Sequence, residues 1–110
     1  MIDWNRVTEL REEVGEEDFQ DVVDMFLDEV SEELETLTSI QGAQEFEEKL
    51  HFLKGAALNL GLSAFADLCK TGEEMARAGH TDGIEPAQII TCYQRSIDEF
   101  SRIINDTAAA

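Results

Sequence analysis

The stretch that decides the fold is residues 50–61, which reads Leu50-His51-Phe52-Leu53-Lys54-Gly55-Ala56-Ala57-Leu58-Asn59-Leu60-Gly61. It contains no proline and no β-branched residue, and its apolar residues recur at helical spacing. At about 100° per residue, one stripe collects five apolar side chains: Phe46, Leu50, Leu53, Ala57 and Leu60. The stretch therefore predicts an amphipathic helix from about 43 to 60, with Gly61 as its C-terminal stop.

Three residues beside this stripe are chemically unusual. His51 is one of only two histidines, Lys54 lies one turn further on, and Gly55 falls next to His51 on the outer side. A glycine inside a helix costs about 1 kcal/mol relative to alanine, which suggests that something must come close there. An ammonium one turn from an imidazole would stabilise a phosphoryl group on that ring. The same residues also fit a half-buried histidine, a solvated lysine and a glycine without a role.

The stretch from His51 to Gly61 resembles the signature of histidine-containing phosphotransfer (HPt) domains, His-x-Leu-Lys-Gly-[Ser/Ala]-[Ser/Ala]-x-x-[apolar]-Gly. The resemblance continues through an apolar run and a cysteine to Glu73, and it covers residues 51–73. Gly72 departs from the pattern, because such proteins usually carry a large apolar residue there.

The resemblance implies a role for each matched site residue. His51 would be the phosphoacceptor through Nε2, and Glu73 would hydrogen-bond the other ring nitrogen and fix the tautomer. Lys54 would offset the charge of the phosphoryl oxygens, and Gly55 would give the partner access. Glu73 lies about 10 residues after the turn at 62–63 and His51 about 11 before it, so helical rise places them at similar heights.

Candidates for partner binding come from three helices. In HPt domains the preceding helix lends apolar residues to the partner face, and Met25 falls off the apolar stripe of that helix. Met25 and Leu27 fit equally well as edges of the core. Four of the eight cations fall between residues 49 and 77, where a phosphoryl anion would be tolerated. The predicted partner-binding residues are Met25, Leu27, Lys49, Leu58 and Lys70.

The rest of the chain predicts further helices. One runs from 3 to 14 with Asp3 as N-cap and Gly15 at its end, and a long one spans 16–40. Another begins with Ser63 as N-cap and continues to about 77, followed by a turn at 79–83. The last helix starts near Pro86, with an apolar stripe that ends at Ile104.

Together these segments predict an all-α fold. Four long helices would form an antiparallel up-down-up-down four-helix bundle, and the short N-terminal helix would cap it. We expect residues 1–110 to be one HPt-like domain, since no linker, repeat or low-complexity block interrupts the pattern.

Composition limits the functional classes. The formal net charge of -17 argues against nucleic-acid binding and against an anionic membrane surface. No signal peptide or membrane span is visible, and the two cysteines show no metal-ligand spacing. These features favour a cytoplasmic protein, with its thiols reduced.

The predicted function is phosphoryl transfer in a two-component phosphorelay. By the resemblance, His51 would accept the group from a receiver-domain aspartyl phosphate and pass it to another receiver. No ATP motif is present, so we expect a monomeric phosphocarrier without autokinase activity and without a cofactor of its own. The Mg²⁺ would sit on the receiver. The partners would be response-regulator receivers, a hybrid sensor kinase, or both.

Two other classes stay open at this point. Glu48-x-x-His51 has the spacing that di-iron bundles use. Such a site needs the motif twice, but the second histidine, His80, has Arg77 in place of a glutamate three residues before it. A non-catalytic helical adaptor that binds receivers would keep the bundle and lose the chemistry. Family members of that kind usually lack the histidine, whereas this chain keeps His51, Lys54 and Gly55.

Overall fold

The computed structural model describes residues 2–109, with side chains for residues 2–102. Its elements are α1 (Trp4–Val14), α2 (Glu16–Glu35), the 3-10 turn η1 (Leu37–Ser39), α3 (Ala43–Leu60), α4 (Ser63–Arg77), the 3-10 turn η2 (Thr81–Gly83) and α5 (Pro86–Ala109). Residues 2–109 contain no strand, so the predicted all-α class is confirmed. The side chain of Ile104 lies outside the described residues.

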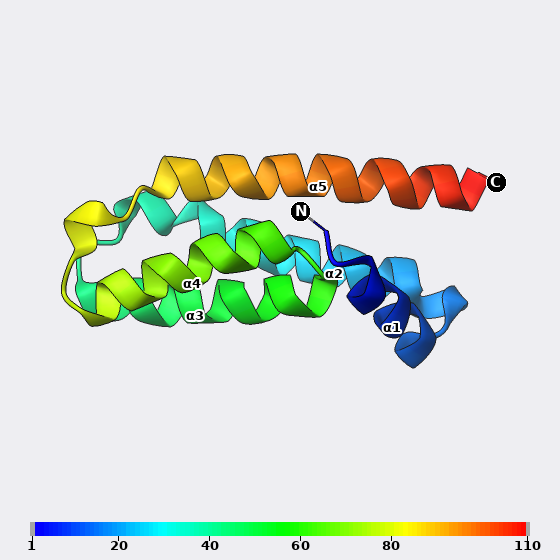
Figure 1. Ribbon diagram of the computed structural model, residues 1–110, viewed down its shortest axis with the longest axis horizontal. Coiled ribbons are helices and arrows are strands. Elements are labelled where there is room, and N and C mark those ends of the chain that lie inside the picture. The colour runs from blue at the N-terminus through cyan, green and yellow to red at the C-terminus, as the bar shows by residue number, and fades with distance from the viewer. Residues whose placement is uncertain (1, 110) are drawn as a thin grey trace.

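The long helices form a bundle. Figure 1 shows α2, α3, α4 and α5 lying lengthwise beside one another, with α1 across one end, in a body of 47 × 22 × 22 Å. The short connection at 61–62 makes α3 and α4 a closely packed hairpin. This hairpin carries residues 50–61, including His51.

The predicted apolar stripe of α3 forms the centre of the core. All five of its residues are buried, and Leu50, Leu53, Ala57 and Leu60 are fully so. Phe65 from α4 and Phe100 from α5 are buried against them. Burying each large apolar side chain contributes about 1.5–3 kcal/mol, so this stripe is a main reason why α3 sits at the centre.

Helix α2 ends earlier than the sequence predicts. The prediction extended it to residue 40, but it stops at Glu35 and continues as η1. Hydroxyl groups explain the break, because Thr36 Oγ1 donates to Glu33 O at 3.3 Å and Ser39 Oγ donates to Thr36 O at 2.9 Å. Such side-chain bonds compete with the helical ladder. The 3-10 turn still buries Leu37 completely.

Helix α1 is tied to the turn between α3 and α4. Asp3 caps it as predicted, since its carboxylate accepts from the Arg6 amide at 3.2 Å. The Asp3 amide donates to Gly61 O at 2.7 Å, and Arg6 Nε donates to Asn59 O at 3.1 Å. Gly61 has a φ of +80°, and a Cβ there would lie 2.7 Å from Asp3 O. Position 61 therefore requires glycine for two reasons: the left-handed backbone that ends α3, and the close approach of Asp3.

Helix α4 begins one residue away from its predicted cap. Leu62 occupies the N-cap position and Ser63 is the first helical residue. Leu62 is completely buried, so packing of this apolar side chain decides where the helix begins. Further along α4, Gly72 is buried, and a Cβ at this position would lie 2.8 Å from Leu50 Cδ1. Gly72 thus lets α4 approach α3 closely, one residue before Glu73.

Candidate functional site

Helices α3 and α4 place the candidate residues in antiparallel register. His51 Nδ1 lies 2.8 Å from Glu73 Oε1, and one turn away Arg77 Nε lies 2.9 Å from Glu47 Oε1. The two pairs fit one antiparallel register, because the four residues from His51 back to Glu47 on α3 match the four residues from Glu73 forward to Arg77 on α4. The contact between His51 and Glu73 occurs at the heights that the turn count predicts.

The imidazole of His51 is exposed on one edge and anchored on the other. Its side chain is 70% exposed, whereas that of Glu73 is only 4% exposed. An ionised carboxylate can only accept hydrogen bonds, so the proton of a neutral imidazole sits on Nδ1. The lone pair then remains on Nε2, on the side of the ring away from Glu73. This arrangement presents a nucleophilic nitrogen to an incoming molecule.

Lys54 forms an ion pair with the buried carboxylate. Its Nζ lies 2.7 Å from Glu73 Oε2, and its side chain is 25% exposed. Lys54 holds the pKa of Glu73 below its ordinary value, against the opposing effect of burial, and His51 adds to the lowering. Glu73 is therefore ionised at neutral pH. In this structure the charge of Lys54 compensates the carboxylate.

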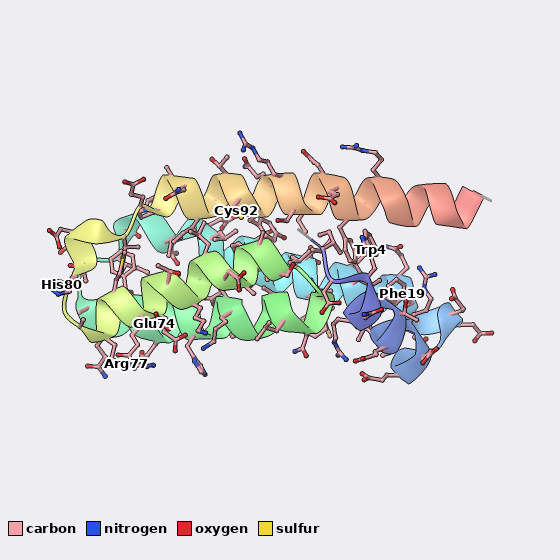
Figure 2. All side chains as sticks on the ribbon, viewed as in Figure 1. Trp4, Phe19, Glu74, Arg77, His80 and Cys92 are labelled. Carbon is pink, nitrogen blue, oxygen red and sulfur yellow. The ribbon has the colours of Figure 1, made fainter. Side chains whose placement is uncertain are left out.

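Arg77 is one of the four cations between residues 49 and 77, and no role was predicted for it. Its Nη2 donates to Glu73 Oε1 at 3.1 Å while its Nε donates to Glu47 on α3. Figure 2 shows Arg77 at the end of α4, facing outward. It lines a groove of about 430 Å³ together with Gln44, Glu47, Glu48, His51 and Glu73. Its spacing of four residues from Glu73 on the same helix could have predicted the contact between the two side chains.

Gly55 lies on the exposed surface one turn after His51. A Cβ at this position would meet no atom within 4 Å, so neighbouring helices do not require the missing side chain. The structure offers no packing reason for a residue that weakens the helix.

The predicted partner-binding residues fall into two groups. Met25 and Leu58 are 52% and 56% exposed, and Lys70 is also exposed. Leu27 packs partly against the core. Lys49 is 15% exposed and its Nζ pairs with Glu33 Oε2 at 2.9 Å, which ties α3 to α2.

Phe52 belongs with the exposed apolar residues and was not among the candidates. It is 42% exposed and follows His51 directly in the chain. Its position off the apolar stripe was the available signal. Met25, Phe52 and Leu58 are the large apolar residues that the structure exposes within residues 2–102.

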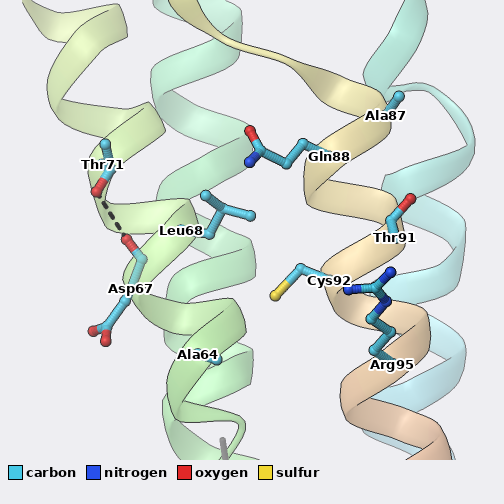
Figure 3. A pocket seen from close by; sticks show the side chains of 9 residues that line it. All are labelled: Ala64, Asp67, Leu68, Thr71, Ala87, Gln88, Thr91, Cys92 and Arg95. Atoms are coloured by element: carbon cyan, nitrogen blue, oxygen red, sulfur yellow. Dashed lines mark hydrogen bonds between the residues drawn. The ribbon is translucent and has the colours of Figure 1, made fainter.

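A second groove, of about 650 Å³, lies between α4 and α5 (Figure 3). Leu68 of α4 and Cys92 of α5 face each other across it, and Thr71 Oγ1 donates to Asp67 O at its edge. None of the predicted site residues lines this groove. The nearby Cys69 is buried, and burial, with a smaller contribution from Cys92, raises its pKa to about 12, so it is a poor nucleophile.

The structure also bears on metal sites and on membrane-spanning helices. Within the described residues, no three His, Cys, Asp or Glu side chains gather into a group that could hold a metal ion. No helix in the described part of the chain combines the length and apolar character needed to cross a membrane.

Comparison with known proteins supports the chemistry that this geometry indicates. The family model described as Hpt domain matches residues 21–102, most of the chain. The chain therefore belongs to the Hpt domain family, whose members act in histidine phosphotransfer of two-component phosphorelays and interact with receiver domains. Neither a comparison with curated proteins nor one with solved structures gives a match.

Proposed function

We propose that this protein is a phosphocarrier in which His51 accepts a phosphoryl group from the aspartyl phosphate of one receiver and passes it to another. The observation that carries this proposal is the exposed imidazole whose Nδ1 faces a buried, ionised Glu73. A fixed Nδ1 proton leaves Nε2 free to attack.

The chemical step is a displacement at phosphorus. His51 Nε2 forms a bond to phosphorus while the bond from phosphorus to the receiver's aspartyl oxygen breaks, and that carboxylate leaves with the electron pair. The Nδ1 proton stays on the ring, hydrogen-bonded to Glu73. The reverse sequence at a second receiver returns His51 to its starting state. Lys54 and Arg77 supply positive charge near the site.

The proposal includes a simple working form for the protein. Residues 1–110 would act as one domain, an up-down-up-down four-helix scaffold capped by α1, working as a cytoplasmic monomer. The Mg²⁺ that phosphoryl transfer needs would sit on the receiver, and no autokinase activity is expected. The face for the receiver would include Met25, Phe52, Leu58 and the open surface at Gly55.

Phosphoryl transfer from a panel of ³²P-labelled receiver domains tests the function. Wild type should acquire a label that is stable in base and labile in acid, and His51→Gln should acquire none. His80→Gln is the matched control, because His80 is an exposed histidine in the loop before η2 (Figure 2). Equal labelling of wild type and His51→Gln would refute the assignment. Binding of receivers without any transfer would identify an adaptor instead.

A further inference from the structure

The two cations beside His51 are already compensated by carboxylates. Lys54 Nζ lies 2.7 Å from Glu73 Oε2, and Arg77 pairs with Glu73 at 3.1 Å and with Glu47 at 2.9 Å. Two positive charges thus face two negative charges in this cluster. Both cations therefore have an anionic partner before a phosphoryl group reaches the imidazole.

Glu48 adds a third carboxylate to the surroundings of His51. The two side chains line the same groove and are three residues apart on α3, a spacing that makes them neighbours on a helix surface. Glu48 is exposed, and its Oε1 accepts a hydrogen bond from the neutral Gln44 amide at 3.3 Å. Among the side chains of residues 2–102, no lysine or arginine lies within ion-pair distance of Glu48. The immediate surroundings of the imidazole are therefore net negative.

The reactive nitrogen of His51 points away from α4, toward the side of α3 that carries Glu48. At 100° per residue, Lys54 lies about 60° from His51 in one direction around the helix, and Glu48 lies about 60° in the other. The Lys54 direction is that of α4, because Lys54 and the imidazole Nδ1 both contact Glu73 on that helix. Nε2 is on the side of the ring away from this contact. A phosphoryl group bound to Nε2 therefore meets the Glu48 side of the helix.

We propose that Glu48 raises the free energy of phosphorylated His51, so that the phosphoryl group passes on to a receiver instead of being stored. This inference rests on the proposed phosphotransfer function. A phosphoryl group carries roughly −1.5 to −2 charge at pH 7, and a carboxylate one turn away repels it.

The effect of Glu48 falls on one side of a reversible reaction. The bond from phosphorus to the aspartyl oxygen of the receiver breaks as the bond to His51 Nε2 forms, and the released carboxylate stays on the receiver. The charge of Glu48 destabilises the phosphorylated histidine but not the phosphorylated receiver in free solution. It therefore shifts the equilibrium of transfer toward the receiver.

The equilibrium of transfer to three variants tests the proposal. A ³²P-labelled receiver that labels wild type is mixed with an equal amount of each protein, and the label on both partners is counted at the plateau before hydrolysis. Glu48→Gln removes the charge and keeps the size of the side chain, and Glu48→Asp keeps the charge. Glu45→Gln is the matched control, because it removes the same charge from an exposed position of α3 about 120° around from His51. Circular dichroism verifies that each variant is folded.

Glu48→Gln should shift the equilibrium roughly threefold toward phosphorylated His51 in 0.05 M NaCl, and the shift should shrink in 0.3 M NaCl. Glu48→Asp and Glu45→Gln should remain close to wild type. Equal shifts in Glu48→Gln and Glu45→Gln, or a Glu48→Gln variant that changes only the affinity for the receiver, would overturn the inference while transfer to His51 still stood. If no receiver labels wild type, the proposed function fails and this inference fails with it.

Discussion

Glu73 is the residue on which the cationic groups of the site converge. Its Oε1 accepts from His51 Nδ1 and from Arg77, and its Oε2 pairs with Lys54. A buried carboxylate needs such compensation, because desolvation alone would favour its neutral form. The two cations keep Glu73 ionised, so that it can serve as a fixed acceptor for the imidazole.

Acid should remove the contribution of Glu73 to stability. Because its pKa is lowered in the folded state, its ionised form stabilises the protein above the ordinary glutamate pKa, and this is lost as pH falls through the folded value. The difference in unfolding free energy between wild type and Glu73→Gln should therefore be larger at pH 7 than at pH 3. Urea unfolding at both pH values measures it. A difference that does not change with pH would contradict the assigned ion pairs.

Lys54 should act on transfer through Glu73. Lys54→Ala and Glu73→Ala should each slow phosphoryl acceptance, and the double variant should be little slower than the slower single variant. Residues that act through one contact give such non-additive effects. Rapid-quench transfer rates for the four proteins measure the coupling.

Lys70 provides the matched comparison, because it is exposed one turn before Glu73. Lys70→Ala combined with Glu73→Ala should be additive to within about twofold. Additivity of Lys54 with Glu73 would instead mean that Lys54 contacts the phosphoryl group independently.

At the scale of helices, two glycines of the central hairpin have opposite surroundings. Gly55 on α3 faces open space, whereas Gly72 on α4 faces the fully buried Leu50. The same substitution at the two positions therefore separates helix propensity from packing.

Gly55→Ala should raise the free energy of unfolding by about 1 kcal/mol, the propensity difference between the residues. Gly72→Ala should lower it, because a Cβ only 2.8 Å from Leu50 Cδ1 forces that side chain to move. Such overpacking typically costs about 1–3 kcal/mol, which exceeds the propensity gain over most of its range. Urea unfolding at pH 7 measures both variants. A stabilised Gly72→Ala would show that Leu50 moves without cost.

Most of each helix could be predicted from the sequence, because periodicity and glycine stops act locally. The bounds of α3 and the stop at Gly61 are confirmed. The end of α2 was predicted wrongly. The helix stops where the Thr36 side chain competes for a backbone hydrogen bond, and this competition leaves no trace in the pattern of apolar residues.

The site could be predicted only in part. Helical rise places His51 opposite Glu73, so a count from the turn was sufficient. Two ion pairs could not be predicted, that of Arg77 with Glu47 and that of Lys49 with Glu33. Each depends on a long side chain that crosses from one helix to another. No spacing rule within one helix contains that information.

At the scale of the whole molecule, excess negative charge opposes folding. The formal net charge is -17, in a body of 47 × 22 × 22 Å. The Debye length falls from about 30 Å at 0.01 M salt to about 10 Å at 0.1 M. In dilute buffer, carboxylates on opposite sides of the bundle therefore repel one another.

Sodium chloride should raise the melting temperature of the protein between 0.01 M and 0.1 M. Screening reduces the repulsion between the carboxylates of the folded bundle. Thermal unfolding followed by circular dichroism measures the effect. Asp82→Lys/Asp98→Lys, with four fewer net negative charges, should gain less from salt. An equal gain in both proteins would contradict self-repulsion as the cause.

The docking of α1 gives this protein a built-in optical reporter. Trp4 is the single tryptophan, and its ring stacks on Phe100 of α5 with centroids 6.1 Å apart. Helix α1 meets α3 at Gly61, ten residues or about 15 Å of helix beyond His51. Indole emission should therefore report detachment of the N-terminal helix without any label. The same signal should stay constant while a receiver occupies the histidine, so stability and association can be followed separately in one cuvette.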